Sequence, residues 1–108
     1  MTDQTATTVN GVEVRLYQDV LERILRKHGE LRSMAQLILE TVHSPDLVLA
    51  GHGNEFLSVR HYPRTAVGSK DMVVVYREDR QLIITAFLTS NRLKLEQKRK
   101  AVWQKPNK

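Results

Sequence analysis

The fold is decided by residues 71–88, which read DMVVVYR (71–77), EDR (78–80) and QLIITAFL (81–88). The first and third segments are rich in the β-branched and aromatic residues that strands favour. The three residues between them are too few for a helical crossover, so we expect the two strands to pair antiparallel as a hairpin. Because both segments are almost entirely apolar, the hairpin is predicted to be covered on at least part of both faces.

Two more strands are predicted upstream of this hairpin. Leu47–Ala50 is a short apolar run that glycines follow, and Glu55–Tyr62 ends before Pro63. The polar segment between Arg64 and Lys70 is expected to be a mobile loop. Val12–Leu16 alternates apolar and polar residues, which fits a short edge strand or an extended lead-in.

Two amphipathic helices are predicted before these strands. Apolar residues recur with helical spacing at Tyr17, Val20, Leu21, Ile24 and Leu25. This first helix is expected to end at about His28, because Gly29 supplies a helix stop. The second is expected to begin at Ser33, which can form a capping box with Gln36, and to end before Pro45. The pair must then cover one face of the sheet.

The C-terminal end allows three interpretations. Asn91 can cap a third helix that contains Leu93 and Leu95. A disordered arm, or a short edge strand over residues 101–103, fits the same residues. With 108 residues the chain has the usual size of one domain. We therefore expect a disordered leader over residues 1–10, a single α+β domain over 11–91 and a basic tail over 92–108.

Composition excludes several classes of site. The chain has no cysteine, which excludes disulfides, a thiolate nucleophile and sulfur-rich zinc sites, and favours a reducing compartment. No apolar run approaches the roughly 20 residues of a membrane span, and the polar start lacks a signal pattern. We expect a cytoplasmic protein that does not contact a membrane.

The net charge of +5 is unevenly distributed. Residues 92–108 hold seven basic residues and one acidic residue, so the rest of the chain is close to neutral. Such a tail attracts polyanions, RNA among them, by counterion release. A tail that only keeps the protein in solution has the same composition.

Familiar catalytic motifs are absent, and so is any recognised metal-ligand spacing among His43, His52 and His61. We expect no metal and no cofactor. Metal-free RNA cleavage needs an acid, a base and fixed positive charge on the phosphate. Side chains with suitable chemistry are His28, Arg60, His61, Lys70, Arg77 and Thr85.

Each of these candidates also has a plain structural interpretation. His28 can simply complement the dipole at a helix end. Lys70 and Arg77 can be charges that blunt strand ends, and Thr85 can bond to the backbone. Arg60 is predicted to lie on the opposite face of its strand from its neighbour, so only one of the two can join a shared site.

Several motifs occur in an order that suggests a family. They are His28 before Gly29-Glu30-Leu31, Pro45-Asp46-Leu47-Val48, Arg60-His61-Tyr62, Met72–Tyr76 and Ile83–Thr89. In this order, from about Arg15 to Trp103, the chain resembles the barnase–EndoU–colicin–RelE (BECR) ribonuclease superfamily, in particular its phage and prophage members. The resemblance implies two N-terminal helices packed on a four-stranded twisted antiparallel sheet, with a metal-independent RNA-cleaving site on the sheet's open face.

The resemblance also implies roles for individual residues. His28 would be the acid or base, Arg60 and Lys70 would hold the phosphate, and Thr85 would bond a phosphate oxygen or orient another group. No strand glutamate matches the base of barnase-like members. Further substrate-binding candidates are His61, Arg64, Arg77, Thr89, Lys98, Arg99 and Lys100.

The leading hypothesis is therefore a metal-independent endoribonuclease that acts as a toxin or a prophage effector. Its expected partners are RNA and an antitoxin or immunity protein. The alternative is a non-catalytic domain of the same fold that binds nucleic acid or protein, and a structural module without a nucleic-acid role is a third interpretation.

Overall fold

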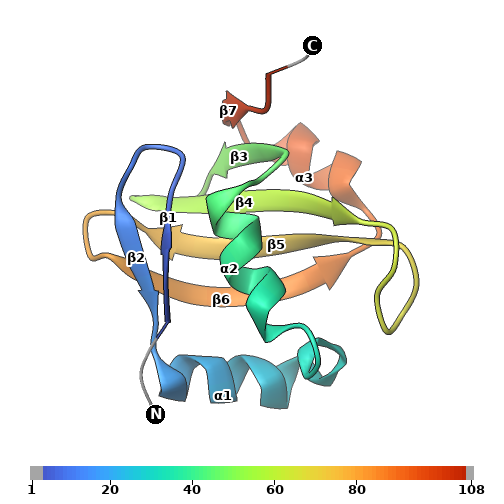
Figure 1. The fold of residues 1–108 in the computed structure, drawn as a ribbon. Coiled ribbons are helices and arrows are strands. Elements are labelled where there is room, and N and C mark those ends of the chain that lie inside the picture. Colours follow the sequence, from blue (N-terminus) through green and yellow to red (C-terminus); the bar gives the residue numbers. More distant parts are fainter. Residues whose placement is uncertain (1–3, 107–108) are drawn as a thin grey trace.

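The computed structural model describes residues 4–106, which form three α-helices, one 3-10 helix and one sheet of seven strands (Figure 1). The outer ends of the predicted leader (1–3) and tail (107–108) lie outside the described residues. The helical elements are α1 (Gln18–Lys27), η1 (Gly29–Leu31), α2 (Ala35–His43) and α3 (Arg92–Lys98). The strands are β1 (Gln4–Thr7), β2 (Glu13–Leu16), β3 (Leu47–Ala50), β4 (Glu55–Tyr62), β5 (Lys70–Arg77), β6 (Leu82–Thr89) and β7 (Ala101–Gln104).

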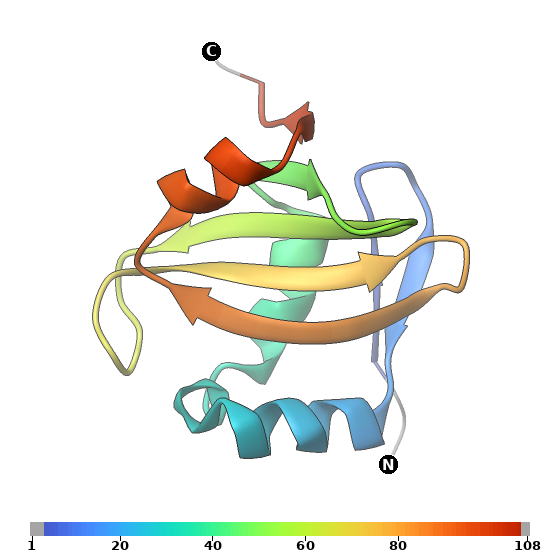
Figure 2. The same ribbon diagram turned by 180° about the vertical axis from the view of Figure 1, so that it is seen from behind.

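The strand order is β1-β2-β6-β5-β4-β3-β7 (Figures 1 and 2). All neighbouring strands pair antiparallel except β2 and β6, which are parallel and meet where Arg15 faces Leu82. The predicted β5–β6 hairpin is confirmed. The prediction of two helices on a four-stranded antiparallel sheet is wrong. The described sheet has seven strands of mixed direction, and the described residues form a third α-helix.

The elements that the sequence did not predict, or left open, are short and mostly exposed. β1 has the sequence QTAT with only Ala6 buried, and β7 has the sequence AVWQ with only Trp103 partly covered. Neither has the apolar alternation that marks a half-buried strand. They form because an edge strand offers unpaired backbone groups to any extended neighbour. β1 lies within the segment predicted to be a disordered leader, and α3 and β7 lie within the predicted tail.

The first predicted helix ends close to where the sequence places its end. The backbone N–H of His28, the residue that follows α1, donates to the carbonyl of Ile24 at 2.7 Å. α2 begins at Ala35 rather than Ser33, which is exposed and does not cap it. The reason lies in the connection, where η1 and the residue before α2 bury Leu31 and Met34 in the core.

α2 packs across one face of the sheet. It contacts β4 and β5 in the middle and β1 at the end, so the sheet curves around it. Val42, Ile38 and Tyr76 are fully buried in this layer. The hydroxyl of Tyr76 and that of Ser58 are also buried there, and neither has a hydrogen-bond partner within normal distance among residues 4–106.

α1 runs along the edge of the sheet beside β6 (Figure 2). β2 pairs with β6 only at Leu82, the first residue of β6, so much of that edge of β6 has no neighbouring strand. The Arg23 side chain reaches over from α1 and donates to the carbonyl of Ile84 at 2.8 Å. α1 therefore takes the place of a further strand.

The face of the sheet away from α2 is called the open face here. It carries a second apolar cluster of Leu47, Leu49, Leu57, Val59, Val73 and Val75, with Ile84, Phe87 and Leu95 packed against it. Leu95 comes from α3, which lies over one side of this face (Figure 2). The predicted covering of the hairpin on part of both faces is thus confirmed.

Truncation of Ile38 in α2 tests the main layer. Ile38→Ala is expected to lower the free energy of unfolding by about 2–5 kcal/mol, because it leaves a cavity against the sheet. Leu93→Ala is the control, since Leu93 is 65% exposed and its loss should change stability by no more than about 0.5 kcal/mol. Urea unfolding measures both, and equal effects would contradict the packing described.

The buried tyrosine predicts how stability depends on alkaline pH. Burial raises the pKa of Tyr76 to about 12, above its ordinary value of 10.0, while the nearby Ser58 lowers it. Between these two values the unfolded chain loses the phenol proton and the folded chain keeps it, so stability must fall as pH rises. Urea unfolding from pH 9 to pH 11 (about one unit on either side of the ordinary value) should show this fall. The decline should be shallower in Tyr76→Phe, and an equal decline would contradict the assignment.

Candidate functional site

Three polar side chains form a row across the open face. His61 on β4 pairs in register with Asp71 on β5, which in turn pairs with Thr89 on β6. Neighbouring strands are about 4.8 Å apart, and residues in register share a face. The row therefore brings an imidazole, a carboxylate and a hydroxyl together at one end of the face.

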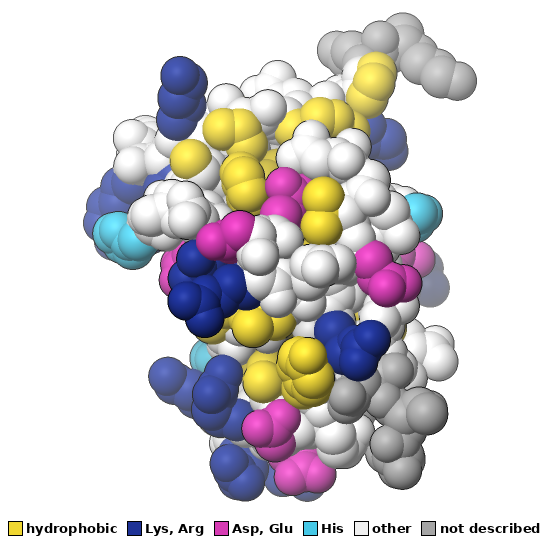
Figure 3. All heavy atoms as spheres, turned by 90° about the vertical axis from the view of Figure 1, so that its left-hand side faces the viewer, with side chains coloured by type: hydrophobic (Ala, Val, Ile, Leu, Met, Phe, Trp, Pro, Cys, Tyr) yellow, Lys and Arg dark blue, Asp and Glu magenta, His cyan; other side chains and the backbone are white. Residues whose placement is uncertain are grey.

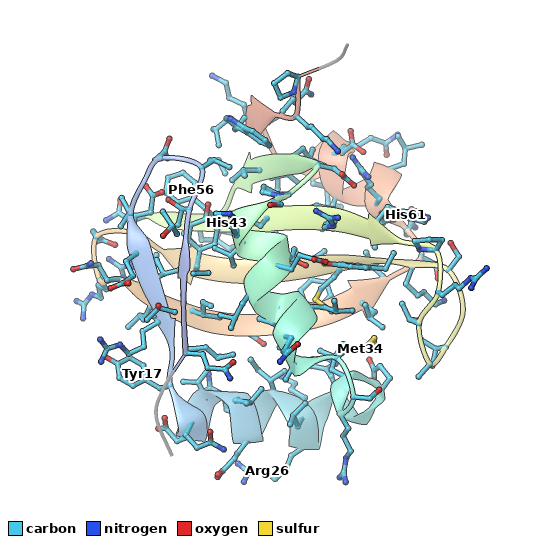
Figure 4. All side chains as sticks on the ribbon, viewed as in Figure 1. Tyr17, Arg26, Met34, His43, Phe56 and His61 are labelled. Carbon is cyan, nitrogen blue, oxygen red and sulfur yellow. The ribbon has the colours of Figure 1, made fainter. Side chains whose placement is uncertain are left out.

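The imidazole of His61 is held between two side chains. Its Nδ1 lies 3.2 Å from Oδ1 of Asp71, and its Nε2 lies 3.2 Å from Oγ of Ser69. The Asp71 side chain is 13% exposed, whereas that of His61 is 48% exposed. A carboxylate at one ring nitrogen fixes the tautomer and leaves the other nitrogen free to accept a proton from a hydroxyl. Figure 4 labels His61 at the end of β4, next to the loop that carries Ser69.

A second layer of charges supports this group. Asp46 accepts a hydrogen bond from the backbone N–H of His61 at 2.8 Å. Nη1 of Arg92 lies 3.4 Å from the Asp46 carboxylate and 3.5 Å from that of Asp71, and its Nε lies 3.3 Å from Glu96. Arg92 thus balances the acids around the imidazole and ties α3 to the open face.

His28 lies beside the open face, at the edge formed by β6. Its ring centroid is 6.3 Å from that of Phe87, and its Nδ1 is 3.8 Å from Glu30. Thr85 pairs with Val75 at a bulge in β6, and by strand alternation it shares the open face with Phe87. His28, His61, Thr85 and Thr89 are therefore brought to one side of the sheet.

Arg60 and Lys70 lie elsewhere. Arg60 faces the α2 side, where its Nη1 donates to the Ser44 carbonyl at 2.6 Å and its Nε is 3.7 Å from Glu40. Lys70 pairs with Tyr62 across the β4–β5 ladder, which places it on the α2 side too, and its ammonium donates to Ser90. Four residues were predicted to act together, and only two of them share the open face.

The remaining candidates are spread over the surface. Arg77 lies at the far end of β5 from His61, and its bond to Asp79 at 2.6 Å holds the pKa of that carboxyl down at about 2. Arg64 is exposed in the loop after β4. Arg99 lies with its Nη2 3.4 Å from Nε2 of His52, and its neighbours Lys98 and Lys100 are exposed.

Basic side chains border the open face on two sides. Dark-blue side chains stand at the upper and lower left of Figure 3, which is the side that carries this face. The exposed basic residues of the two helices that border this face are Arg23, Arg26 and Lys27 on α1, and Lys94, Lys98 and Lys100 on or just after α3. A polyanion lying across the face would meet cations at both borders.

The sequence interpretation missed Ser69, Asp71, Asp46 and Arg92 as site residues. One signal was present for Asp71, which is an acid directly before the apolar run of β5. A buried carboxylate is stable only with a hydrogen-bonding or charged partner, so the position of Asp71 predicts a cation or a histidine nearby. No local sequence pattern identifies Ser69, because its contact with His61 depends on the path of the loop between β4 and β5.

Two further findings bear on the site. Among residues 4–106 no group of three or more His, Asp or Glu side chains is placed to hold a metal ion. None of the helices described is long and apolar enough to cross a membrane.

Comparisons with protein-family models, with curated proteins and with solved structures gave no match to this chain. Membership of the barnase–EndoU–colicin–RelE superfamily therefore stays a prediction from the motifs.

Proposed function

We propose that this protein is a metal-independent endoribonuclease whose site lies on the open face of the sheet. The observation that carries the proposal is the imidazole of His61, which is held at Nδ1 by the nearly buried Asp71 and faces a hydroxyl at Nε2. The motif order and the basic borders of the open face support it. A cytoplasmic location and an antitoxin or immunity protein as partner are further parts of the proposal.

In this mechanism His61 is the base. Its Nε2 takes the proton of a ribose 2′-hydroxyl, which occupies the place of the Ser69 hydroxyl when RNA is bound. Asp71 fixes the ring tautomer and stabilises the imidazolium that forms. This assignment supplies the base that no strand glutamate provides.

The other polar groups of the face complete the reaction. The 2′-oxygen attacks the adjacent phosphorus, and His28 protonates the departing 5′-oxygen from the β6 side. The hydroxyls of Thr85 and Thr89 donate to the phosphoryl oxygens as negative charge builds up. The products are a 2′,3′-cyclic phosphate and a 5′-hydroxyl, and no water or metal ion enters this step.

A non-catalytic nucleic-acid-binding domain is the second candidate. The observation that favours it is the set of exposed cations at Lys94, Lys98 and Lys100. The proposed cleavage reaction does not need these cations. Such cations bind phosphates without regard to sequence. Attraction of RNA and cleavage of RNA are thus separable properties.

Cleavage of RNA in the presence of a chelator tests the catalytic proposal. His61→Gln is expected to lower the rate by about 10²–10⁴-fold, because it removes the base, and His28→Ala by a similar factor. Thr85→Ala should have a smaller effect. A substrate with 2′-deoxyribose at the cleaved position should remain intact.

The matched control is His52→Gln, since His52 is an exposed histidine in the β3–β4 turn, outside the row of polar side chains on the open face. Intact RNA with the unaltered protein, or full activity in both His61→Gln and His28→Ala, would sink the catalytic proposal.

Salt dependence tests the binding proposal. Affinity for an uncleavable 2′-deoxy analogue of the substrate should fall steeply with salt, because binding releases counterions. Lys98→Ala and Lys100→Ala should each reduce the slope of log affinity against log salt by about one. Arg80→Ala, in the exposed β5–β6 turn, should leave the slope unchanged. An unaltered slope in the two lysine variants would show that these cations do not contact phosphate.

A toxin role predicts growth arrest on expression. A co-expressed product of a neighbouring gene should relieve the arrest if it is the antitoxin, whereas His61→Gln should relieve it without any partner. Arrest that persists in His61→Gln would contradict a toxin that acts by RNA cleavage.

A further inference from the structure

A pocket of about 360 Å³ lies on the α2 side of the sheet, opposite the open face. It is formed where the end of α2, β4 and β7 meet, and it is lined by Val9, His43, Ser44, Pro45, Arg60, Trp103 and Lys105. Figure 4 labels His43 at the end of α2 that leads into β3. The volume is in the range of pockets that bind small molecules.

The strand register explains why these residues meet. Trp103 on β7 pairs with Val48 on β3, and Val48 pairs with Ser58 on β4. Arg60 is two residues beyond Ser58, so it points to the same face. Lys105 follows Trp103 by two residues, and its backbone N–H donates to Asp46 beside β3. An indole and two cations therefore stand on one side of three adjacent strands.

The pocket is electropositive. Its lining contains Arg60, Lys105 and a histidine, and it contains no acidic residue. The guanidinium of Arg60 is held by the Ser44 carbonyl at 2.6 Å and stacks 5.6 Å above the Tyr62 ring. Glu40 lies 3.7 Å from Arg60, outside the pocket lining, and its carboxylate accepts a hydrogen bond from the Tyr62 hydroxyl at 2.8 Å.

Lys105 has no ion pair with any residue between 4 and 106. Arg60 offers five N–H donors, and its bond to the Ser44 carbonyl uses one of them. The Arg60 guanidinium and the Lys105 ammonium belong to segments about two strand spacings apart, roughly 10 Å between backbones, and can contact one phosphate from both sides. Trp103 is half-buried and lines the pocket with an aromatic ring of the kind on which bases stack.

We propose that this pocket binds a nucleoside monophosphate group, with the base stacked on Trp103 and the phosphate between Arg60 and Lys105. The ligand is either a free nucleotide or the phosphorylated end of an RNA chain. The proposal does not depend on the cleavage proposal, because none of these residues lies on the open face.

Tryptophan fluorescence tests the proposal directly, because Trp103 is the only tryptophan of the chain. The full chain is titrated with adenosine 5′-monophosphate, adenosine, ribose 5-phosphate and inorganic phosphate. We expect a saturable change with the monophosphate and at least about tenfold weaker binding of the other three, since each lacks the base or the phosphate. No change with the monophosphate, or equal affinity for inorganic phosphate, would overturn the proposal.

Lys105→Ala should weaken binding of the monophosphate by about tenfold without affecting the fold, because Lys105 is exposed. Arg80→Ala is the control, as Arg80 is an exposed cation outside the pocket lining. Equal binding by Lys105→Ala and the unaltered protein would contradict the assignment of the phosphate position.

Two further arms identify the source of the ligand and separate the two proposals. A short RNA with a 5′-phosphate that competes with the monophosphate, when its 5′-hydroxyl form does not, assigns the pocket to an RNA end. Competition by neither form assigns it to a free nucleotide. The variant His61→Gln should lose RNA cleavage and still bind the monophosphate normally. Failure of the cleavage proposal can therefore be distinguished from failure of the pocket proposal.

Discussion

β5 lies in the middle of the sheet, and all of its residues from Asp71 to Tyr76 are buried. An apolar strand in this position must be covered on both faces, which is why α2 packs on one side and α3 folds back onto the other. The same burial extends to the carboxylate at the start of the strand. An acid held there costs free energy unless it is paired, and His61 and Arg92 supply the partners. The position of Asp71 near the start of β5 thus explains why His61 and Arg92 gather there to form the candidate site.

The central elements could be predicted from the sequence because their signals are local. Long apolar runs and a three-residue turn place β4, β5 and β6 within about one residue of their observed bounds. Apolar alternation also indicated β2 as a short edge strand. β1 lacks such alternation, and β7 pairs with the distant β3, so no local pattern decides that either of them forms a strand. The C-terminal segment was ambiguous for the same reason, and it contains both a helix capped by Asn91 and a strand.

The site was predictable only in part. Strand alternation correctly separates Arg60 from His61, and the end of α1 correctly brings His28 towards the sheet. The sequence could not show which histidine has a carboxylate partner, since that depends on the register of β4 against β5. Nor could it show that Arg60 and Trp103 share a pocket, because the strand that carries the indole was only one of three interpretations of the C-terminal segment and its pairing partner was not predicted.

α1 has a role that its amphipathic pattern does not reveal. Because β2 pairs with β6 only at Leu82, the first residue of β6, the backbone groups along much of this edge of β6 would face solvent if α1 moved away. Arg23 already takes the carbonyl of Ile84, which such an edge would otherwise offer to another molecule. An uncovered edge next to an apolar strand is a template for intermolecular β-pairing. α1 therefore protects the folded chain against self-association, and partial unfolding that begins at this helix would open a route to aggregation.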